Sequence, residues 1–199
     1  MKKLLAGFAV FLITLFAALA FLLPYKDIYD NLINKYVQNM QLQAYYNITN
    51  ASLFSLNTSN VSIKKDGYLF HFDKIKAKVS PFKYLFGENF LRLQLRSAAD
   101  LASVAIKKNK NLWYITIKTP SSMFKSVVKN FQLPFPIQGD LLIKTKIKNE
   151  GNQLLIKKIS VRGQINIDAR GYIKNYHLRL NGKIKFGKME QEFNFDQRL

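Results

Sequence analysis

A strict period of two, with a lysine at every second position, is the feature that most restricts the fold of this chain. The stretch LIKTKIK, residues 142–148, places its lysines at Lys144, Lys146 and Lys148. Successive side chains of a β-strand point to opposite faces, so this stretch predicts a strand with one apolar and one cationic face. The same scheme recurs at Lys74, Lys76 and Lys78, at Arg92 and Arg96, and at Lys183 and Lys185.

Most of the chain after residue 44 continues this period and predicts about ten strands. We expect them near residues 61–64, 68–72, 74–79, 91–96, 101–106, 112–119, 142–148, 154–161, 164–173, 177–186 and 192–195. Asp66-Gly67, Glu150-Gly151 and Gly187-Lys188 have the composition of hairpin turns. Because long crossovers are scarce, the sheet should be largely antiparallel. Burying only the Ile, Leu and Val side of each strand predicts a curved sheet, apolar on its concave face and cationic on its convex face.

Three segments favour short helices over strands. Residues 25–40 carry apolar side chains at three- and four-residue spacing, which predicts an amphipathic helix that lies on a membrane surface or caps the sheet. Residues 81–87 suit one or two helical turns that end at a glycine. Residues 120–130 begin with Pro120 ahead of two serines, a plausible helix start. The expected fold class is therefore mainly β with two or three short helices.

The first 24 residues have the composition of a membrane anchor. Lys2 and Lys3 precede an uncharged run from Leu4 to Leu23, which spans roughly 30 Å as a helix, the thickness of a bilayer core. The predicted anchor residues are Leu4, Leu5, Phe8, Val10, Phe11, Leu12, Ile13, Leu15, Phe16, Leu19, Phe21, Leu22 and Leu23. The alternative is a signal peptide cleaved after Ala20, although the apolar run continues past that site.

The lysines before the run indicate the orientation of the chain. By the positive-inside rule the N-terminus lies in the cytoplasm and everything after Pro24 lies across the membrane. In a bacterium this is a single-pass inner-membrane protein whose bulk is periplasmic. We expect three parts: the anchor at 1–24, a juxtamembrane helix at 25–43 and a β-rich periplasmic domain at 44–199.

The charge balance favours an anionic partner. Lys and Arg number 31 against 12 Asp and Glu, giving a net charge of +19. Nucleic acid and lipid headgroups are the usual partners of such surfaces, and a periplasmic location argues against nucleic acid. Two plainer explanations stay open. The residues of AT-rich codons are abundant throughout the chain, and lysines on solvent-exposed strand faces oppose aggregation.

The sequence offers little for catalysis. It has no cysteine and only two histidines, His71 and His177, which lie far apart. No carboxylate pair stands out as a catalytic dyad, and no nucleotide-binding or nucleophile motif is present. We therefore expect a protein that is not an enzyme, with no catalytic residues, no metal ligands and no cofactor.

Two stretches carry a family resemblance. FDKIKAKVSPFKYLFGENFLRLQL, residues 72–95, resembles an element of AsmA-like proteins, in which a strand, a Pro- or Leu-rich segment and a returning strand follow one another. PSSMFKSVVKNFQLPFPIQGDLLIKTKI, residues 120–147, resembles a segment of the type II secretion system protein N (GspN) family. There a short helix leads through a proline-containing stretch into a strand, as at residues 133–141 here.

The resemblance implies an inner-membrane accessory component of a type II secretion system, with a structural role and other secretion components as partners. The AsmA-like relationship implies the alternative, an envelope protein that binds or carries phospholipid or lipopolysaccharide in an apolar β-groove. The chain is short for an AsmA-like protein. Candidate groove residues are Ile75, Val79, Leu91, Leu93, Leu95, Ile143, Ile147, Ile184 and Phe186.

Overall fold

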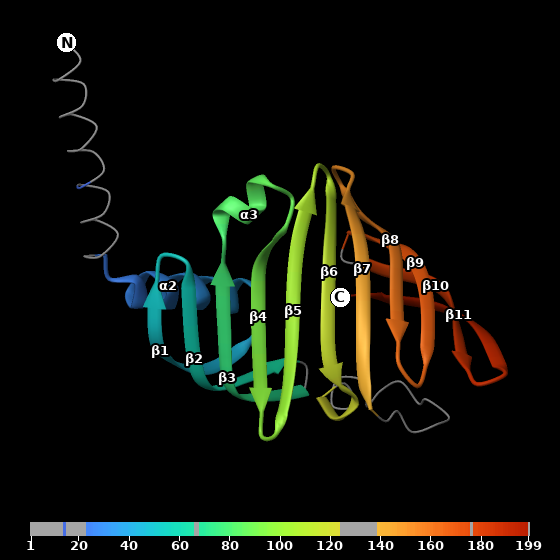
Figure 1. Ribbon diagram of the computed structural model, residues 1–199, viewed down its shortest axis with the longest axis horizontal. Coiled ribbons are helices and arrows are strands. Elements are labelled where there is room, and N and C mark those ends of the chain that lie inside the picture. Colours follow the sequence, from blue (N-terminus) through green and yellow to red (C-terminus); the bar gives the residue numbers. More distant parts are fainter. Residues whose placement is uncertain (1–13, 15–22, 66–67, 124–138, 176, 199) are drawn as a thin grey trace, which may run out of the picture.

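The computed structural model describes residue 14 and residues 23–65, 68–123, 139–175 and 177–198. Over these residues the chain forms one sheet of 11 antiparallel strands (Figure 1). Every strand pairs with its neighbours in the sequence, so the spatial order is the chain order. The predicted mainly β, antiparallel architecture is confirmed, and the sheet is visibly twisted and curved.

Most strands and helices fall close to the predicted ranges, but no strand was predicted over residues 43–52, and the strands predicted at 68–72 and 74–79 form a single strand. The strands are β1 Gln43–Ser52, β2 Ser55–Lys65, β3 Tyr68–Val79, β4 Asn89–Ser97, β5 Asp100–Asn109, β6 Leu112–Pro120, β7 Asp140–Asn149, β8 Gln153–Arg162, β9 Asn166–Lys174, β10 His177–Phe186 and β11 Met189–Arg198. The helices are α2 Tyr25–Asn39 and α3 Pro81–Leu85. Residues 121–123 are also helical, and the remainder of the third predicted helix lies outside the described residues.

The predicted residues of the membrane anchor lie outside the described ones, apart from Leu23, which is 41 % exposed. Among the described segments, no helix is both long and apolar enough to cross a bilayer.

The turns follow the predicted chemistry where they are described. Gly151 and Gly187 have φ of +68° and +58°, a conformation that costs glycine little. Asp66-Gly67 lies outside the described residues. The predicted strand 164–173 starts too early, because β9 begins only at Asn166. Ile165 instead belongs to the preceding turn, where it is 1 % exposed and packs against Leu141 and Val161.

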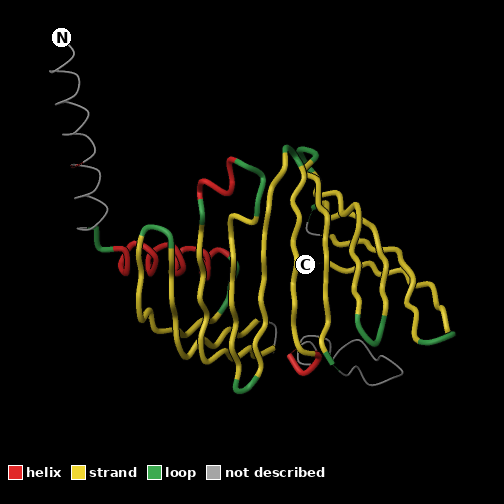
Figure 2. The backbone as a smooth tube through the Cα atoms, viewed as in Figure 1, coloured by secondary structure: helices red, strands yellow, loops and turns green. Residues whose placement is uncertain are grey.

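The sheet bends along the first three strands. Thr58 and Val61 are both buried although three positions separate them, so the alternation of β2 reverses between them. Asn60 has φ of +50° at this point, and the pairing of β1 with β2 shifts register beside it. Irregularities of this kind bend strands and increase their twist. Figure 2 shows the resulting turn of β1, β2 and β3 toward the rear of the sheet.

Helix α2 lies behind the bent strands and packs on β1 (Figure 1). Its partly buried side is formed by Tyr29, Ile33 and Val37. The Tyr46 hydroxyl of β1 lies 2.9 Å from a carboxylate oxygen of Asp30 and 2.9 Å from the side-chain oxygen of Asn34. The helix therefore caps this end of the sheet, one of the two roles expected for it.

Candidate functional site

The sheet has one continuous apolar face. The strand registers align one row of side chains across the whole sheet. The row runs Ala51, Leu56, Ala77, Leu93, Val104, Ile117, Ile143, Val161, Ile167 and Ile184, and ends at Gln191. Only the last of these residues is polar. A row this long makes a strip of hydrocarbon surface at right angles to the strands.

All nine predicted groove residues lie on strands of this face. Ile75 pairs with Leu95 and Val79 with Leu91, so these four side chains lie together on β3 and β4. Leu93 belongs to the continuous row itself. Ile143 and Ile147 lie on β7 and Ile184 and Phe186 on β10, separated from the first group by β5 and β6. The prediction thus named two ends of one face and missed the middle, where Val104, Ile115 and Ile117 connect them.

The apolar face is only partly covered. None of the nine groove residues is fully buried, and Val79 is 40 % exposed. Leu141, Val161 and Ile165 form the buried cluster, against which Ile143, Ile184 and Phe186 pack. The main helix contacts in the described part of the chain are α2 on β1 and α3 on β4. Among the described residues, the middle of the face is therefore covered only by side chains of the sheet itself.

Trp113 lies on the same face, near the start of β6, and is part of a group of aromatic side chains. It pairs with Ile147 of β7, and its ring centroid lies 6.1 Å from that of Phe90. Phe90 in turn meets Tyr84 of α3 edge to face at 5.1 Å. These contacts make Trp113 part of the packing on this face.

The opposite face of the central strands is cationic. It carries Lys74, Lys76, Lys78, Arg92, Arg96, Lys107, Lys118, Lys144 and Lys146, which we call the cationic face. None of these nine makes an ion pair with a described carboxylate. Lys74 even lies opposite Arg96, and Lys78 opposite Arg92. Like charges directly across a pair of strands destabilise it.

Tyr114 stands at the centre of this face. Its ring has the ammonium groups of Lys107 and Lys146 at 5.3 and 5.5 Å from its centroid, one from each neighbouring strand. Tyr114 and Lys144 line two adjoining shallow hollows, of about 470 and 380 Å³. Arg92, Lys107 and the carboxylate-bearing Glu88 help to line one hollow, and Lys158 and Arg162 help to line the other. Cations around an aromatic ring suit a phosphate-bearing or other anionic ligand.

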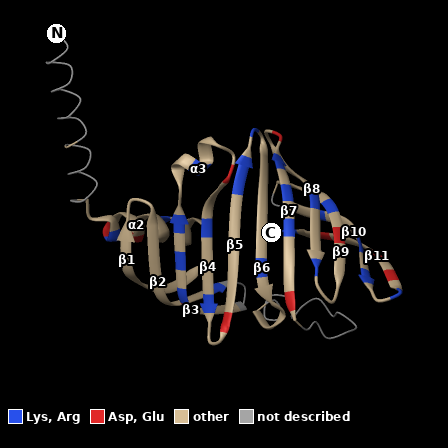
Figure 3. Cartoon of the chain, viewed as in Figure 1, with Lys and Arg blue, Asp and Glu red and all other residues tan. Residues whose placement is uncertain are grey.

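The last strands, β9 to β11, differ from the central strands, because carboxylates neutralise their cations. Figure 3 shows acidic bands among the basic ones on β9 and β11. Lys183 lies 3.0 Å from Glu190 and 3.1 Å from Glu192, and Lys185 lies 2.7 Å from Glu190. The hydrogen bonds from Lys185 and Lys183 hold the pKa of Glu190 below its ordinary value. Of the four cationic stretches of the sequence, the one on β10 is therefore neutralised, and the one on β7 is neutralised only at Lys148, which lies 2.6 Å from Glu150. The stretches on β3 and β4 make no ion pair with a described carboxylate.

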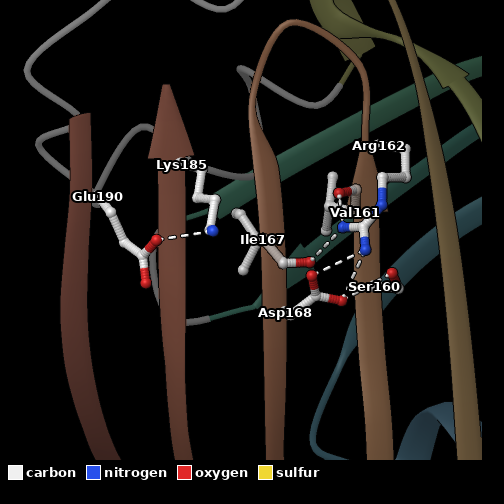
Figure 4. Close-up of polar contacts among 7 residues, drawn as sticks. All are labelled: Ser160, Val161, Arg162, Ile167, Asp168, Lys185 and Glu190. Atoms are coloured by element: carbon white, nitrogen blue, oxygen red, sulfur yellow. Dashed lines mark hydrogen bonds and ion pairs between the residues drawn. The ribbon is translucent and has the colours of Figure 1, made fainter. Parts of the chain in front are cut away.

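Arg162 and Asp168 make the best-defined polar contact of the neutralised region (Figure 4). Partial desolvation acts to raise the pKa of Asp168. The hydrogen bonds from Arg162 and Ser160, the latter 2.9 Å long, outweigh it and keep that pKa below its ordinary value. The Lys185–Glu190 pair could have been predicted from the sequence. Both residues lie at the same distance from the Gly187-Lys188 turn, so a hairpin places them opposite each other. The sequence offers no comparable signal for Arg162 and Asp168.

The described residues include no cluster suited to hold a metal ion. His71 lies 3.5 Å from Asp73, and His177 lies 3.7 Å from Asp196, as two separate pairs on the surface. The Ser62 hydroxyl lies 3.0 Å from Nδ1 of His71, and Nε of Arg179 lies 2.7 Å from Asp196, so each pair has a further polar neighbour. The side chains of His71 and Asp73 are 54 and 48 % exposed, so this group lies on the open surface and not in an enclosed site. The two faces of the sheet are thus the features from which a function can be argued.

No family model, no curated protein and no solved structure matches this chain. The fold and its two faces define the class of protein in structural terms. It is an antiparallel meander with one apolar face and one cationic face.

Proposed function

We propose that this chain is a membrane-anchored envelope protein that holds lipid acyl chains along the apolar face of its sheet. The observation that carries the proposal is the unbroken apolar row from Ala51 on β1 to Ile184 on β10. Partly exposed hydrocarbon on this scale costs about 25 cal/mol for each Å² left in water. An acyl chain laid across the strands covers such a strip and needs no specific polar contacts.

The cationic face does not serve the same lipid molecule directly. Because alternate side chains of a strand point to opposite faces, the sheet itself separates Lys144 from its neighbour Ile143. A headgroup could meet cations only around the edge of the sheet. We assign the cationic face to a separate role, attraction of the protein to anionic surfaces, which acts over about 8 Å at physiological salt.

Trp113 provides the test of lipid binding. It is the sole tryptophan and lies on the apolar face, so acyl chains bearing bromine should quench its fluorescence. We expect saturable quenching when brominated phosphatidylglycerol is titrated into the detergent-solubilised full chain. Unbrominated lipid is the control, and native mass spectrometry of the same sample gives the stoichiometry. Brominated lipid that leaves Trp113 unquenched, together with a lipid-free mass, would refute the proposal.

A matched pair of variants separates the two faces. Leu93 and Gln94 are neighbours on β4, and Leu93 lies in the apolar row while Gln94 pairs with Lys76 on the other face. Leu93→Asp should weaken the quenching by about tenfold or more in lipid concentration, because a charge opposes hydrocarbon at that point. Gln94→Asp should leave it unchanged. Equal effects of the two substitutions would contradict an apolar binding face.

A second candidate function is a structural component of a type II secretion system. The resemblance of residues 120–147 to the GspN family supports it, together with the edges of β1 and β11, which pair with no other described strand. An unpaired edge can accept a strand from a partner protein. Purification of the full chain from the source membranes should then recover identified secretion components. Their absence, with secretion intact after deletion of the gene, would exclude this function.

A further inference from the structure

One end of the sheet exposes a cluster of large apolar side chains. It consists of Leu53 and Phe54 in the β1–β2 turn, and Phe82, Leu85 and Phe86 in and after α3. These are exposed by 46, 47, 74, 75 and 79 % respectively. We call these five residues the apolar rim. Isolated exposed apolar residues are ordinary, but a cluster of this kind on one edge marks an interaction site.

The two parts of the rim are connected to each other and to the sheet. The Val79 amide donates a 2.8 Å hydrogen bond to the Phe54 carbonyl, which places the β1–β2 turn beside the strand that leads into α3. Tyr84 packs its ring against Phe90 and accepts a 3.1 Å hydrogen bond from Lys108. Because Tyr84 fixes α3 to the sheet, the other apolar side chains of that helix are held away from it.

Lysines surround the apolar rim. Lys83 lies within α3, with its side chain 43 % exposed and 3.6 Å from Glu88. Lys108 lies 5.6 Å from the centre of the Tyr84 ring, and Lys78 lies at the end of β3, next to Val79. Phe and Leu with aromatic neighbours and flanking lysines form the usual composition of segments that enter the interface of a bilayer.

The rim lies at the same end of the sheet as Leu23, where the uncharged run of residues 4–23 ends. We call this run the leader. The Tyr29 hydroxyl of α2 donates a 3.4 Å hydrogen bond to the carbonyl of Leu53, a rim residue. Only about 6 Å of helix separates Tyr29 from Tyr25, the first residue of α2, and Pro24 alone lies between Tyr25 and Leu23, the last residue of the uncharged run. A bilayer that holds this run is therefore within reach of the rim.

We propose that the apolar rim inserts into the interfacial layer of the membrane in which the leader is anchored, with Lys78, Lys83 and Lys108 facing anionic headgroups. This inference rests on the membrane placement that is part of the proposed function. It fixes the orientation of the protein: β1–β4 stand with their α3 end on the bilayer, and the opposite hairpin ends point away from it. The open apolar face then meets the membrane at one end, where acyl chains could pass between the two.

The absence of cysteine from the chain allows a direct test of this orientation. Single cysteines would replace Leu85 and Phe54 in the rim, and Leu101 and Met189 at the other end of the sheet. The two control positions are 56 and 64 % exposed, which matches the rim. Each full-length variant would carry the environment-sensitive dye NBD and be reconstituted in vesicles of phosphatidylcholine and phosphatidylglycerol, three parts to one.

We expect nitroxide-bearing lipids to remove most of the NBD emission at positions 85 and 54 and none at positions 101 and 189. The further substitutions Phe82→Ser and Phe86→Ser, made together, should restore emission from the label at position 54, because the rim then loses its two most exposed aromatic side chains. This second readout does not depend on a dye placed in α3.

Three results would overturn the inference, and they differ from one another. Rim labels quenched by aqueous iodide as readily as the controls would show that the rim stays in water. Rim labels shielded from both quenchers, in a way that depends on protein concentration, would indicate a contact with a second copy. Extraction of the whole chain by alkaline carbonate would overturn the membrane placement as well as the rim.

Discussion

The Arg162 guanidinium on β8 donates hydrogen bonds of 2.9 and 2.7 Å to the two carboxylate oxygens of Asp168 on β9. This two-point contact and the Ser160 hydroxyl stabilise the ionised form of Asp168, whose pKa is lowered in the folded protein. Among the described residues of β8 to β11, it is the one carboxylate that a guanidinium contacts through both oxygens. The pair therefore offers the clearest electrostatic test of the fold.

We predict that the stability provided by Asp168 depends on pH in the acidic range. A carboxylate whose pKa is depressed on folding stabilises the protein above its unfolded pKa of about 3.9, and this contribution is lost as the pH falls through the folded pKa. Asp168→Asn should lower stability by about 1 kcal/mol or less at pH ~7, because the pair is half exposed. Urea unfolding of both proteins from neutral to acidic pH measures this, and the difference should vanish at the acidic end. Asp140→Asn is the control, and a pH-independent difference would contradict the prediction.

The charges of the sheet predict opposite effects from two similar substitutions. Lys146 lies opposite Lys158, whereas Lys183 is already paired with two glutamates. Lys146→Glu should raise stability by about 0.2–1 kcal/mol, because it replaces a repulsive cross-strand pair by an attractive one. Lys183→Glu should lower stability. Thermal unfolding at low salt tests both, and the two effects should shrink as salt is added. A lower Tm for Lys146→Glu would show that the cationic face is not under repulsion.

Tyr46 should make the docking of α2 sensitive to alkaline pH. Burial and the hydrogen bond to Asp30 raise the pKa of Tyr46 to about 12. A group whose folded pKa is raised stabilises the protein fully below its unfolded pKa of about 10, and this stability is lost as the pH rises toward the folded value. Tyr46→Phe should remove that alkaline loss, as followed by thermal unfolding.

Tyr45 is the matched control for this experiment. It is the preceding residue on β1, and it lies on the other face with 73 % of its surface exposed. Tyr45→Phe should keep the alkaline loss of stability. The same pH dependence in both variants would indicate that the titration belongs to another group.

The buried cluster should respond strongly to truncation. Leu141 is 2 % exposed and packs with Val161 and Ile165 in the turn before β9. Leu141→Ala should destabilise the protein by about 2–5 kcal/mol, because a cavity remains where the side chain was removed. Leu69→Ala, at a position 66 % exposed, should change stability by less than about 0.5 kcal/mol. Denaturant unfolding in detergent measures both, and equal losses would mean that this cluster is not the core.

The alternation of apolar and charged residues was enough to predict most of the fold. Lys144, Lys146 and Lys148 lie on one side of a strand as expected, since a period of two leaves only this arrangement. The strand ends were less predictable, and Ile165 shows why. In the sequence it continues the alternation of β9, but in the fold it turns inward to fill the space beside Leu141. That choice depends on packing between strands, which a local pattern does not contain.

The candidate site was predictable in kind but not in detail. The groove residues Leu93 and Ile143 lie on one row, yet the registers of the four strands β4 to β7 must be known before this becomes visible. The exposure of Phe82 and Phe86 had no signal either. PFKYLFG, residues 81–87, has the composition of a packed segment, and only the position of Tyr84 shows which side of α3 meets the sheet.

The order of strands in this sheet equals their order along the chain, and no strand is inserted between two that precede it. A hairpin added or removed at the β11 end would therefore leave the pairing of the other strands unchanged. The connectivity of such a meander does not fix the number of its strands. Its breadth, and with it the length of the apolar strip that crosses the strands, is a quantity that duplication of short segments could adjust one step at a time.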